Sequence, residues 1–543
     1  MNATLRQERR ITAIAVAIAV AFACLLTPHL VRNTMAAFLD NESGRFGPMQ
    51  FEIPEPSPMI ATKRNSYLGA TFVALSDTGH AAYVWGYRGT GMSGTGQETV
   101  DATSAVSVVK LEGDRKMVTI TGGTTMATAP DTMGAIGVLA SDGTVWTWGN
   151  AATPARLGRA IVNGDNSKPK QVIFPDLGGA KVIDLQSGAK VFVALTDTGD
   201  VYTWGHYFDD NSSTPGKAEG DLGQGPKAES SRPRKILTGI HSIGTGVQNS
   251  WAIASDKWSV LIYAEGMDSK AAPQEFPGKD GATVLFWGRD HTHFGSASGD
   301  PALKDQIHPS PVPVAKTAGL NKLLQDGTKA GDDNTSLGKA LGSTEDKGTF
   351  RQLGGISYGS YALLKDGSVY AWGNPTYGGS GGAATVDRPG DTPMKVSLPD
   401  PTNGYQQATI KQVVSVRKLV FMLDTTGTVW MYGYLYRAER ELFPKADGTT
   451  PAASSNTAIG NPIRIAGAPG TGWAAGEITG LGSPGEMTLM VTHADGSVWL
   501  AGGGNARTPT NTRALVRNHW KDNTVPTTAA VPITKTDLSS LPK

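Results

Sequence analysis

The chain has 543 residues, with 49 basic and 48 acidic side chains and a formal net charge of +1 at pH 7. This balance lacks the basic excess of nucleic-acid-binding domains, so we expect no nucleic-acid partner. The only cysteine is Cys24, which excludes an intrachain disulfide and a cysteine-ligated metal site.

The N-terminus differs from the rest of the chain. Residues 1–10 form a basic segment that contains Arg6, Arg9 and Arg10. Residues 11–27 carry no charge, and as a helix they would span about 25 Å, close to the ~30 Å hydrocarbon core of a bilayer. Basic residues before an apolar helix keep the N-terminus in the cytoplasm. We therefore expect a signal anchor or transmembrane helix over residues 11–31, in a single-pass protein of the inner (cytoplasmic) membrane. The remaining chain would lie on the periplasmic or extracellular side.

Two other fates of this segment stay open. A cleaved signal peptide with its cleavage site after Ala23 is one of them. Cleavage there would make Cys24 the first residue, as in a lipoprotein, although Ala21 stands where leucine is preferred and Phe22 is bulky. Each version exports the rest of the chain. Residues 32–46 then form a stalk or linker between the membrane and the main domain.

The phrase DGTVWTWGN (residues 142–150) recurs in altered form along the rest of the chain. The residue before its last glycine is, in order, Trp85, Trp148, Trp204, Trp287, Trp372, Tyr432 and Ala501. Ordered copies of this kind indicate a repeat protein. An apolar run precedes each phrase, usually across an Asp-Gly or Thr-Gly pair, as in FVALTDTG (residues 192–199). Two β-rich runs joined in this way predict an antiparallel hairpin in every unit, because glycine supplies the positive φ of a tight turn.

A short strand with proline at its head follows most hairpins, as in PKQVIFP (residues 169–175). Proline is tolerated at the edge or start of a sheet, so we place this strand at the outer edge of each unit. Small sheets arranged radially cover one another's faces. The predicted fold class is therefore all-β: a seven-bladed β-propeller over residues 47–543, preceded by the N-terminal transmembrane or signal helix. We expect PMQFEIP (residues 48–54) and PITKTDL (residues 532–538) to complete a shared blade, since an open circle leaves unpaired edges.

The order of these features resembles the regulator of chromosome condensation repeat family, as a bacterial, membrane-anchored or exported member. The resemblance implies a seven-bladed β-propeller and a role in binding proteins. Two family features are altered. The glycine-x-x-histidine before the second strand is absent from GATFVAL, GAKVFVAL and SYGSYALL, and the glycine-glutamine-leucine-glycine loop has a weak counterpart in DLGQG (residues 221–225).

The recurring tryptophans have a structural interpretation. An aromatic ring on a strand fills the wedge between neighbouring blades and buries roughly 150–250 Å². We therefore expect these tryptophans to form the core and not a substrate platform.

The residues after each Trp-Gly pair should lie together on one rim, because equivalent positions of equivalent blades share a circle. Two insertions, at about residues 206–230 and 289–352, leave from the same position. Tyrosine and arginine, which are enriched at interface hot spots, are frequent in this set. The candidate binding residues are Tyr87, Arg88, Asn150, His206, Tyr207, Phe208, Arg289, Asp290, Phe294, Asn374 and Tyr434.

Motifs for catalysis are scarce. His291 and His293 form an H-x-H pair that is only a weak metal candidate, since two ligands do not make a zinc or copper site. We assign no catalytic residue, metal or cofactor. The sequence favours a non-catalytic, membrane-tethered scaffold with a protein or cell-surface partner, and the alternative is a metal-assisted lyase or hydrolase built on the same fold.

Overall fold

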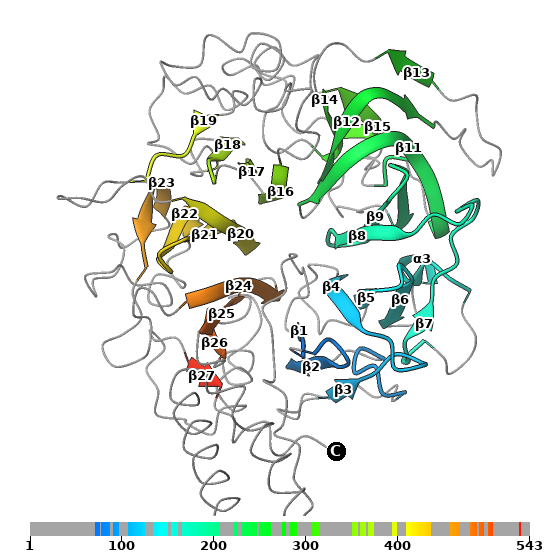
Figure 1. The fold of residues 1–543 in the computed structure, drawn as a ribbon, viewed down its shortest axis with the longest axis horizontal. Coiled ribbons are helices and arrows are strands. Elements are labelled where there is room, and N and C mark those ends of the chain that lie inside the picture. The colour runs from blue at the N-terminus through cyan, green and yellow to red at the C-terminus, as the bar shows by residue number, and fades with distance from the viewer. Residues whose placement is uncertain are drawn as a thin grey trace, which may run out of the picture. The chain divides into compact units, whose positions relative to one another are not determined.

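The regular elements in the described part of the chain are strands, apart from one short helix, α3 (Pro154–Leu157) (Figure 1). Residues 56–543 form one compact unit, and every described residue belongs to it. The computed structural model describes residues 71–76, 78–86, 91–96, 107–124, 134–149, 154–160, 166–206, 222–225, 230–246, 249–261, 274–277, 283–289, 307–313, 350–356, 359–364, 367–373, 379, 394–398, 409–416, 418–435, 457–465, 478–485, 488–493, 498–502 and 531–533.

Four sheets share one plan, in which four antiparallel strands pair in chain order. The first consists of β4 (Met117–Thr124), β5 (Gly134–Ala140), β6 (Val145–Gly149) and β7 (Lys170–Gln171). The second consists of β16 (Phe350–Ile356), β17 (Gly359–Leu364), β18 (Val369–Gly373) and β19 (Met394–Lys395). The third consists of β20 (Ile410–Val416), β21 (Leu419–Asp424), β22 (Val429–Leu435) and β23 (Thr457–Arg464). The fourth consists of β24 (Ile478–Gly485), β25 (Thr488–His493), β26 (Val498–Gly502) and β27 (Val531–Ile533).

Two further sheets vary this plan. A three-stranded sheet contains β1 (Thr71–Leu75), β2 (Ala82–Gly86) and β3 (Ser107–Val109). An eight-stranded sheet contains β8 (Val182–Ser187), β9 (Val191–Thr196), β10 (Val201–Gly205), β11 (Ser230–Thr245), β12 (Asn249–Val260), β13 (Gln274–Pro277), β14 (Thr283–Arg289) and β15 (Ile307–Pro313). Two units merge in the larger sheet because the first half of β11 pairs with β10 and its second half pairs with β12.

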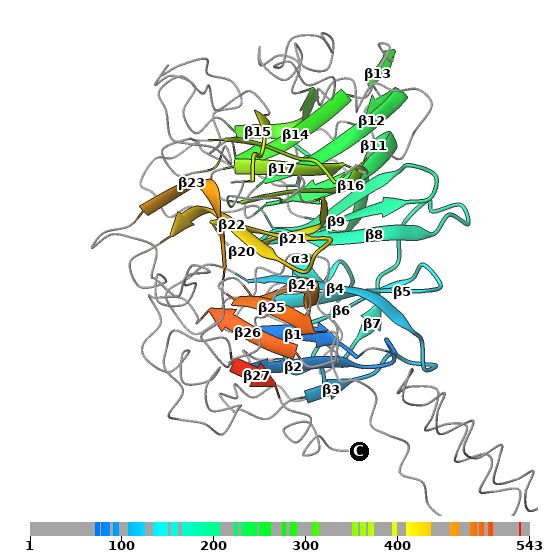
Figure 2. The ribbon, with the colours of Figure 1, turned by 60° about the vertical axis from the view of Figure 1, so that its left-hand side comes forward.

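The sheets contact one another in chain order, and the last contacts the first. Strand β4 packs between β1 and β8, β16 packs between β11 and β20, and β24 packs between β20 and β1. Figures 1 and 2 show these strands around a common centre, with the later strands of each sheet farther out.

The predicted hairpins are confirmed in the described strands. Strand pairs β1–β2, β5–β6, β9–β10, β12–β14, β17–β18, β21–β22 and β25–β26 are antiparallel. The turn glycines have positive φ, as at Gly143 (φ 87°) and Gly199 (φ 84°).

Four of the proline-containing strands lie at a sheet edge, as expected: β7, β19, β23 and β27 each end their sheet. The corresponding segment PRKIL (residues 233–237) does not, because it is part of β11, which lies between β10 and β12. The last sheet takes all four strands from residues 478–533. Residues 48–54, which we expected to complete this blade with residues 532–538, lie outside the described residues, so the shared blade stays a prediction.

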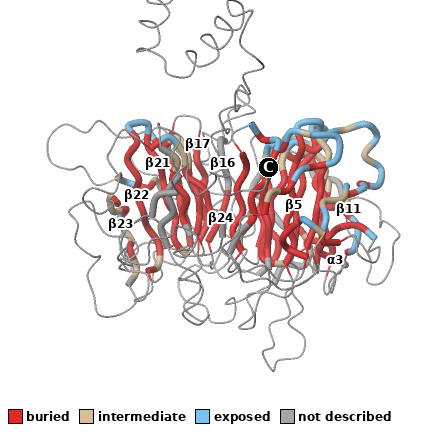
Figure 3. Tube along the Cα trace, turned by 90° about the horizontal axis from the view of Figure 1, so that it is seen from below, coloured by how far each residue is buried: buried red, intermediate tan, exposed pale blue. Residues whose placement is uncertain are grey.

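The Trp-Gly aromatics whose side chains are described form the core, as predicted. Trp148, Trp204, Trp287 and Tyr432 are 0% exposed, and Trp372 is 1% exposed. Trp204 stacks on Phe192 with ring centroids 5.2 Å apart and an interplanar angle of 11°. Three apolar clusters mix residues of neighbouring sheets, so that burial between sheets helps to hold them together. Figure 3 shows buried residues along the strands and many exposed ones at one end, with α3 toward the other.

Candidate functional site

The two ends of the strands differ in chemistry. We call the end where the Trp-Gly phrases stop the strand-exit rim; His206 and Tyr434 are its described examples. The opposite end, which we call the turn rim, holds the Asp-Gly and Thr-Gly turns, such as residues 140–144 and 196–200.

The strand-exit rim repeats one backbone arrangement in two sheets. The N–H of His206 donates to the carbonyl of Lys190 at 3.1 Å, and the N–H of Tyr434 donates to that of Lys418 at 2.9 Å. The Lys418 ammonium lies 5.4 Å from the centroid of the Tyr434 ring, a cation–π distance. Both predicted rim residues are partly exposed. The two sheets therefore share the backbone bond, and the contact between a ring and a lysine is that of Tyr434 with Lys418.

Only three of the predicted rim residues, His206, Arg289 and Tyr434, lie among the described residues. Arg289 ends β14, where its backbone pairs with Ile307, and it follows a Trp-Gly pair just as His206 does. The other predicted rim residues lie outside the described residues: Tyr87, Arg88, Asn150, Tyr207, Phe208, Asp290, Phe294 and Asn374. The weak metal candidates His291 and His293 also lie outside them.

The loops after the Trp-Gly pairs are anchored in the same way in two sheets. The Thr147 hydroxyl donates to the Leu157 carbonyl, and the Thr203 hydroxyl donates to the Leu222 carbonyl, both at 2.6 Å. In return, Gln224 Nε2 donates to the Thr203 carbonyl at 2.9 Å. Sequence reasoning missed this match because only the Leu-Gly pair is common to the two loops.

Two loops that follow a Trp-Gly pair also reach the tryptophan of the next sheet, namely the loop of Met92 and the loop of Arg156 and Leu157. The indole N–H of Trp148 donates to the Met92 carbonyl at 3.1 Å, and that of Trp204 donates to the Arg156 carbonyl at 3.2 Å. Arg156 is 3% exposed, and burial lowers its pKa to about 10, which still leaves it charged at neutral pH. The loop that contains Arg156 and Leu157 is therefore bound to its own sheet through Thr147 and to the next sheet through Trp204.

At the turn rim, several hairpin turns hydrogen-bond to a strand of the following unit. The Gly79 carbonyl accepts from the N–H of Met117 at 2.7 Å and the Gly367 carbonyl from that of Ile410 at 3.1 Å, both in the next sheet, and the Gly199 carbonyl accepts from the N–H of Ile240 in β11 of its own sheet at 2.9 Å. These bonds satisfy backbone groups that the sheets leave unpaired at their ends. They also fix neighbouring turns relative to one another.

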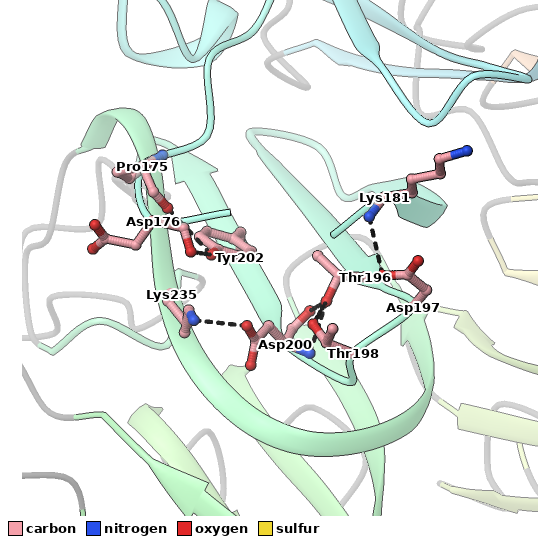
Figure 4. A network of polar contacts seen from close by, with 9 residues as sticks. All are labelled: Pro175, Asp176, Lys181, Thr196, Asp197, Thr198, Asp200, Tyr202 and Lys235. Atoms are coloured by element: carbon pink, nitrogen blue, oxygen red, sulfur yellow. Dashed lines mark hydrogen bonds and ion pairs between the residues drawn. The ribbon is translucent and has the colours of Figure 1, made fainter. Parts of the chain in front are cut away.

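Figure 4 shows the polar contacts of one such turn. The Lys235 ammonium donates to Asp200 at 2.6 Å, and the Tyr202 hydroxyl donates to the Pro175 carbonyl at 3.2 Å. Asp197 accepts from the backbone N–H of Lys181 at 3.0 Å, while the Lys181 ammonium points away from the network.

The neighbouring turn contains a comparable ion pair. Arg115 Nε donates to Asp142 at 2.9 Å, and the guanidinium lies 5.2 Å from the Trp146 ring centroid. Burial raises the pKa of Asp142, but hydrogen bonds from Thr144 and the Arg115 charge outweigh it, so the pKa lies below its usual value.

Side-chain amides join the inner strands near the common centre. Gln186 Nε2 donates to the Ile243 carbonyl at 2.8 Å. The side-chain amide of Gln412 makes two hydrogen bonds to the backbone of Leu481: Nε2 donates to the carbonyl at 2.5 Å, and Oε1 accepts from the N–H at 2.9 Å. The first bond joins β8 to β11, two strands of the eight-stranded sheet that do not pair with each other, and the bonds of Gln412 join β20 to β24 of the next sheet.

No three histidine, cysteine, aspartate or glutamate residues among the described residues gather as a metal-binding group. None of the helices formed by the described residues has the length and apolarity needed to span a membrane.

Comparison with solved structures places the fold. The structure matches Prp20p from Saccharomyces cerevisiae, a protein described with its binding properties to Gsp1p and histones, at a TM-score of 0.52 and 15% identity over 88% of each chain. It also matches yeast RCC1 (Prp20) in a complex with Kap60, at a TM-score of 0.50 and 16% identity over 89% of this chain and 94% of that one. The fold is an RCC1-like β-propeller. No family model matches the sequence, so the resemblance lies in the fold and in the repeated motifs.

Proposed function

We propose that the protein is a non-catalytic scaffold that binds a protein or cell-surface partner through the strand-exit rim of its propeller. The observation that carries this proposal is the repeated pairing of His206 with Lys190 and of Tyr434 with Lys418. It fixes the backbone of a partly exposed rim residue at matching positions of two sheets, and in one of them the Tyr434 ring lies 5.4 Å from the Lys418 ammonium. Tyrosine is among the residues that anchor protein interfaces.

The comparisons support a protein partner. The two similar structures are described with Gsp1p and histones and with Kap60. At 15–16% identity, the structural similarity shows that the fold is shared. It does not show a shared function, because function depends on the residues of the site. We therefore take from these structures only the class of partner, a protein.

We also propose that the propeller has seven blades. The closed circle of contacts supports this count if the eight-stranded sheet is taken as two blades that share β11. The three-stranded sheet that begins with β1 is then the first blade, and the sheet that ends with β27 is the last.

The tether to the membrane is part of the same proposal. The uncharged residues 11–27 after Arg6, Arg9 and Arg10 support a signal anchor in a bacterial inner membrane with the propeller outside the cytoplasm. This segment lies outside the described residues. A rim held near the membrane would meet proteins of the cell envelope.

Capture from envelope extracts tests the binding rim. The full chain in detergent should retain a partner that His206→Ala combined with Tyr434→Ala loses or binds about ten-fold more weakly. Lys110→Ala combined with Glu112→Ala, two exposed residues after β3 at the turn rim, is the matched control and should retain it.

Two results would overturn the proposal. Capture that survives the strand-exit changes but is abolished by the control would move the site to the other rim. Stoichiometric bound metal in the purified chain, together with turnover of a substrate, would favour the metal-assisted lyase or hydrolase.

A further inference from the structure

Two neighbouring sheets have a buried threonine where the other units have an apolar residue. The position is two places before the last glycine of the repeated phrase, and the threonines are Thr147 in β6 and Thr203 in β10. The five other units have Val84, Phe286, Ala371, Met431 and Leu500 there. Both threonines are 0% exposed. Burying a hydroxyl costs free energy unless it forms a hydrogen bond, so these two sheets have a local requirement that the other five do not share.

In the first of these sheets, the hydroxyl bonds the loop that leaves β6. Thr147 Oγ1 donates to the Leu157 carbonyl at 2.6 Å, and Arg159 Nη2 donates back to the Thr147 carbonyl at 3.2 Å. Arg159 is 8% exposed, and it also bonds the residues that lead into β7. Its Nη1 donates to Asn166 Oδ1 at 3.3 Å, and its Nη2 lies 3.5 Å from the Lys168 carbonyl. One side chain therefore joins both ends of the loop.

The next sheet repeats the arrangement with a different donor. Thr203 Oγ1 donates to the Leu222 carbonyl at 2.6 Å. Gln224 Nε2 donates to the carbonyl and the hydroxyl oxygen of Thr203, at 2.9 and 3.0 Å. The loop between them begins at His206, a partly exposed residue of the strand-exit rim. We call each set of threonine, leucine carbonyl and arginine or glutamine a loop clasp.

Each loop clasp also packs on the next sheet. The residue after the leucine is Gly158 in one loop and Gly223 in the other, with φ of 66° and 67°. A Cβ at Gly158 would lie 2.6 Å from Trp204 Nε1, and one at Gly223 would lie 2.9 Å from Trp287 Cδ1. The clasps therefore cannot shift without moving a buried tryptophan of the neighbouring unit.

We propose that Arg159 and Gln224 are positioning residues of the strand-exit rim, which hold the loops of two neighbouring sheets in the conformation that binds the partner. The inference rests on the function proposed above. A loop that is already held at both ends loses less conformational freedom on binding, which raises affinity without a new contact. Formation of the strands does not require the clasp, because the five other units form theirs with an apolar residue at the threonine position.

Gln224→Met tests the clasp itself. Methionine keeps the approximate shape of glutamine and removes the donor. The loop sequence after His206 contains two chymotrypsin sites, Tyr207 and Phe208. Cleavage there, mapped by mass spectrometry on the full chain in detergent, should be about three- to ten-fold faster in the variant, which corresponds to the loss of one net hydrogen bond. The melting temperature should change little, because the variant also removes Gln224 Oε1, a buried acceptor without a partner among the described residues.

The positioning role is read from affinity for the envelope protein that the unchanged chain captures. Gln224→Met and Arg159→Met should each weaken capture about three- to ten-fold. Arg159→Gln introduces the side chain that makes the same bond in the next sheet, and it should restore most of the capture that Arg159→Met loses. A role of Arg159 in packing alone would not distinguish glutamine from methionine in this way.

Thr121→Val is the matched control. Thr121 is a buried threonine of the same pair of sheets, and its hydroxyl bonds the Ser187 hydroxyl at 2.7 Å between the inner strands β4 and β8, away from both clasps. The variant should lower the melting temperature and leave both chymotrypsin cleavage of the loop and partner capture unchanged.

Three results would overturn the inference: cleavage of Gln224→Met at the rate of the unchanged chain, unchanged capture by both methionine variants, and equal weakening of capture by Thr121→Val. The function proposed above fails in a different way. Capture lost in Gln224→Met but retained in His206→Ala combined with Tyr434→Ala would remove that pair from the binding site and keep the clasps as positioning residues. Capture lost in the alanine pair but retained in both methionine variants would do the reverse.

Discussion

At the scale of the residue, a turn glycine can be required by its positive φ alone or also by a close contact with the next sheet. Gly143 has φ 87°, and a Cβ there would lie 2.7 Å from Cβ of Lys181 in the next sheet. Gly178 has φ 60° with nothing within 4 Å of a Cβ. We expect Gly178→Ala to cost about 1–2 kcal/mol for the left-handed backbone, and Gly143→Ala to cost about 1–3 kcal/mol more because it pushes two sheets apart. Denaturant unfolding of both variants measures the difference, and equal losses would show that the contact between sheets is unimportant.

Two buried tyrosines form another matched pair. Tyr432 occupies the position at which other units have a tryptophan, and its hydroxyl has no hydrogen-bond partner among the described residues. The Tyr202 hydroxyl, in contrast, donates to the Pro175 carbonyl. Tyr432→Phe should therefore leave the free energy of unfolding unchanged or raise it by about 1 kcal/mol, and Tyr202→Phe should lower it by about 0.5–1.5 kcal/mol. Thermal melting of the two variants distinguishes them.

Alkaline pH offers a second test of Tyr432. Burial raises the pKa of Tyr432 well above its ordinary value, and the nearby Tyr361 raises it further. The unfolded chain then ionises first, so this contribution to stability is complete below a pH of about 10 and is lost as the pH rises through the folded pKa. Tyr432→Phe should lose less stability between pH 9 and about 11 than the unchanged chain. An identical pH profile would contradict the assignment.

At the scale of the element, β27 closes the edge of the last sheet. Its backbone pairs Val531 with Leu500 and Ile533 with Val498. Deleting residues 530–543 should lower the free energy of unfolding by roughly 1–4 kcal/mol, the loss of a few backbone hydrogen bonds and an exposed strand edge. Deleting only residues 536–543 keeps β27 and should leave the melting temperature unchanged. Equal melting of both truncated chains would show that β27 does not seal the sheet.

The elements also show what a sequence can predict. Hairpins, edge strands and buried tryptophans followed from local rules, since turn glycines, prolines and alternating apolar residues act within a few positions. The β-bulge at Val118 in β4 was not predicted, because an extra residue is defined only against the partner strand. Contacts between sheets, such as that of the Gly79 carbonyl with the N–H of Met117, were missed for the same reason. At the strand-exit rim, the match between His206 and Tyr434 followed from the repeat, but their lysine neighbours come from the opposing strand.

At the scale of the whole molecule, the strand-exit rim and the turn rim lie at opposite ends of the strands. Each rim is supported by bonds that cross from one sheet to the next, the indole bonds at the strand-exit rim and the glycine carbonyl bonds at the turn rim. A partner at either rim would therefore bind a surface built by at least two sheets, and its affinity should depend on the closure of the circle as well as on the contacting residues.

The basic N-terminus determines on which side of the membrane we expect the propeller to lie. If Arg6, Arg9 and Arg10 hold the N-terminus in the cytoplasm, an alkaline phosphatase fused after Lys543 should be active, because this enzyme folds only where its disulfides form. Replacing the three arginines with glutamate should lower phosphatase activity at least several-fold, since orientation follows the basic residues beside an apolar segment. Lys110→Glu combined with Lys116→Glu changes the charge within the propeller and should leave the activity unchanged. An inactive fusion with the unchanged chain recovered from the cytoplasm would remove the membrane tether from the proposed function and leave the strand-exit rim to partners inside the cell.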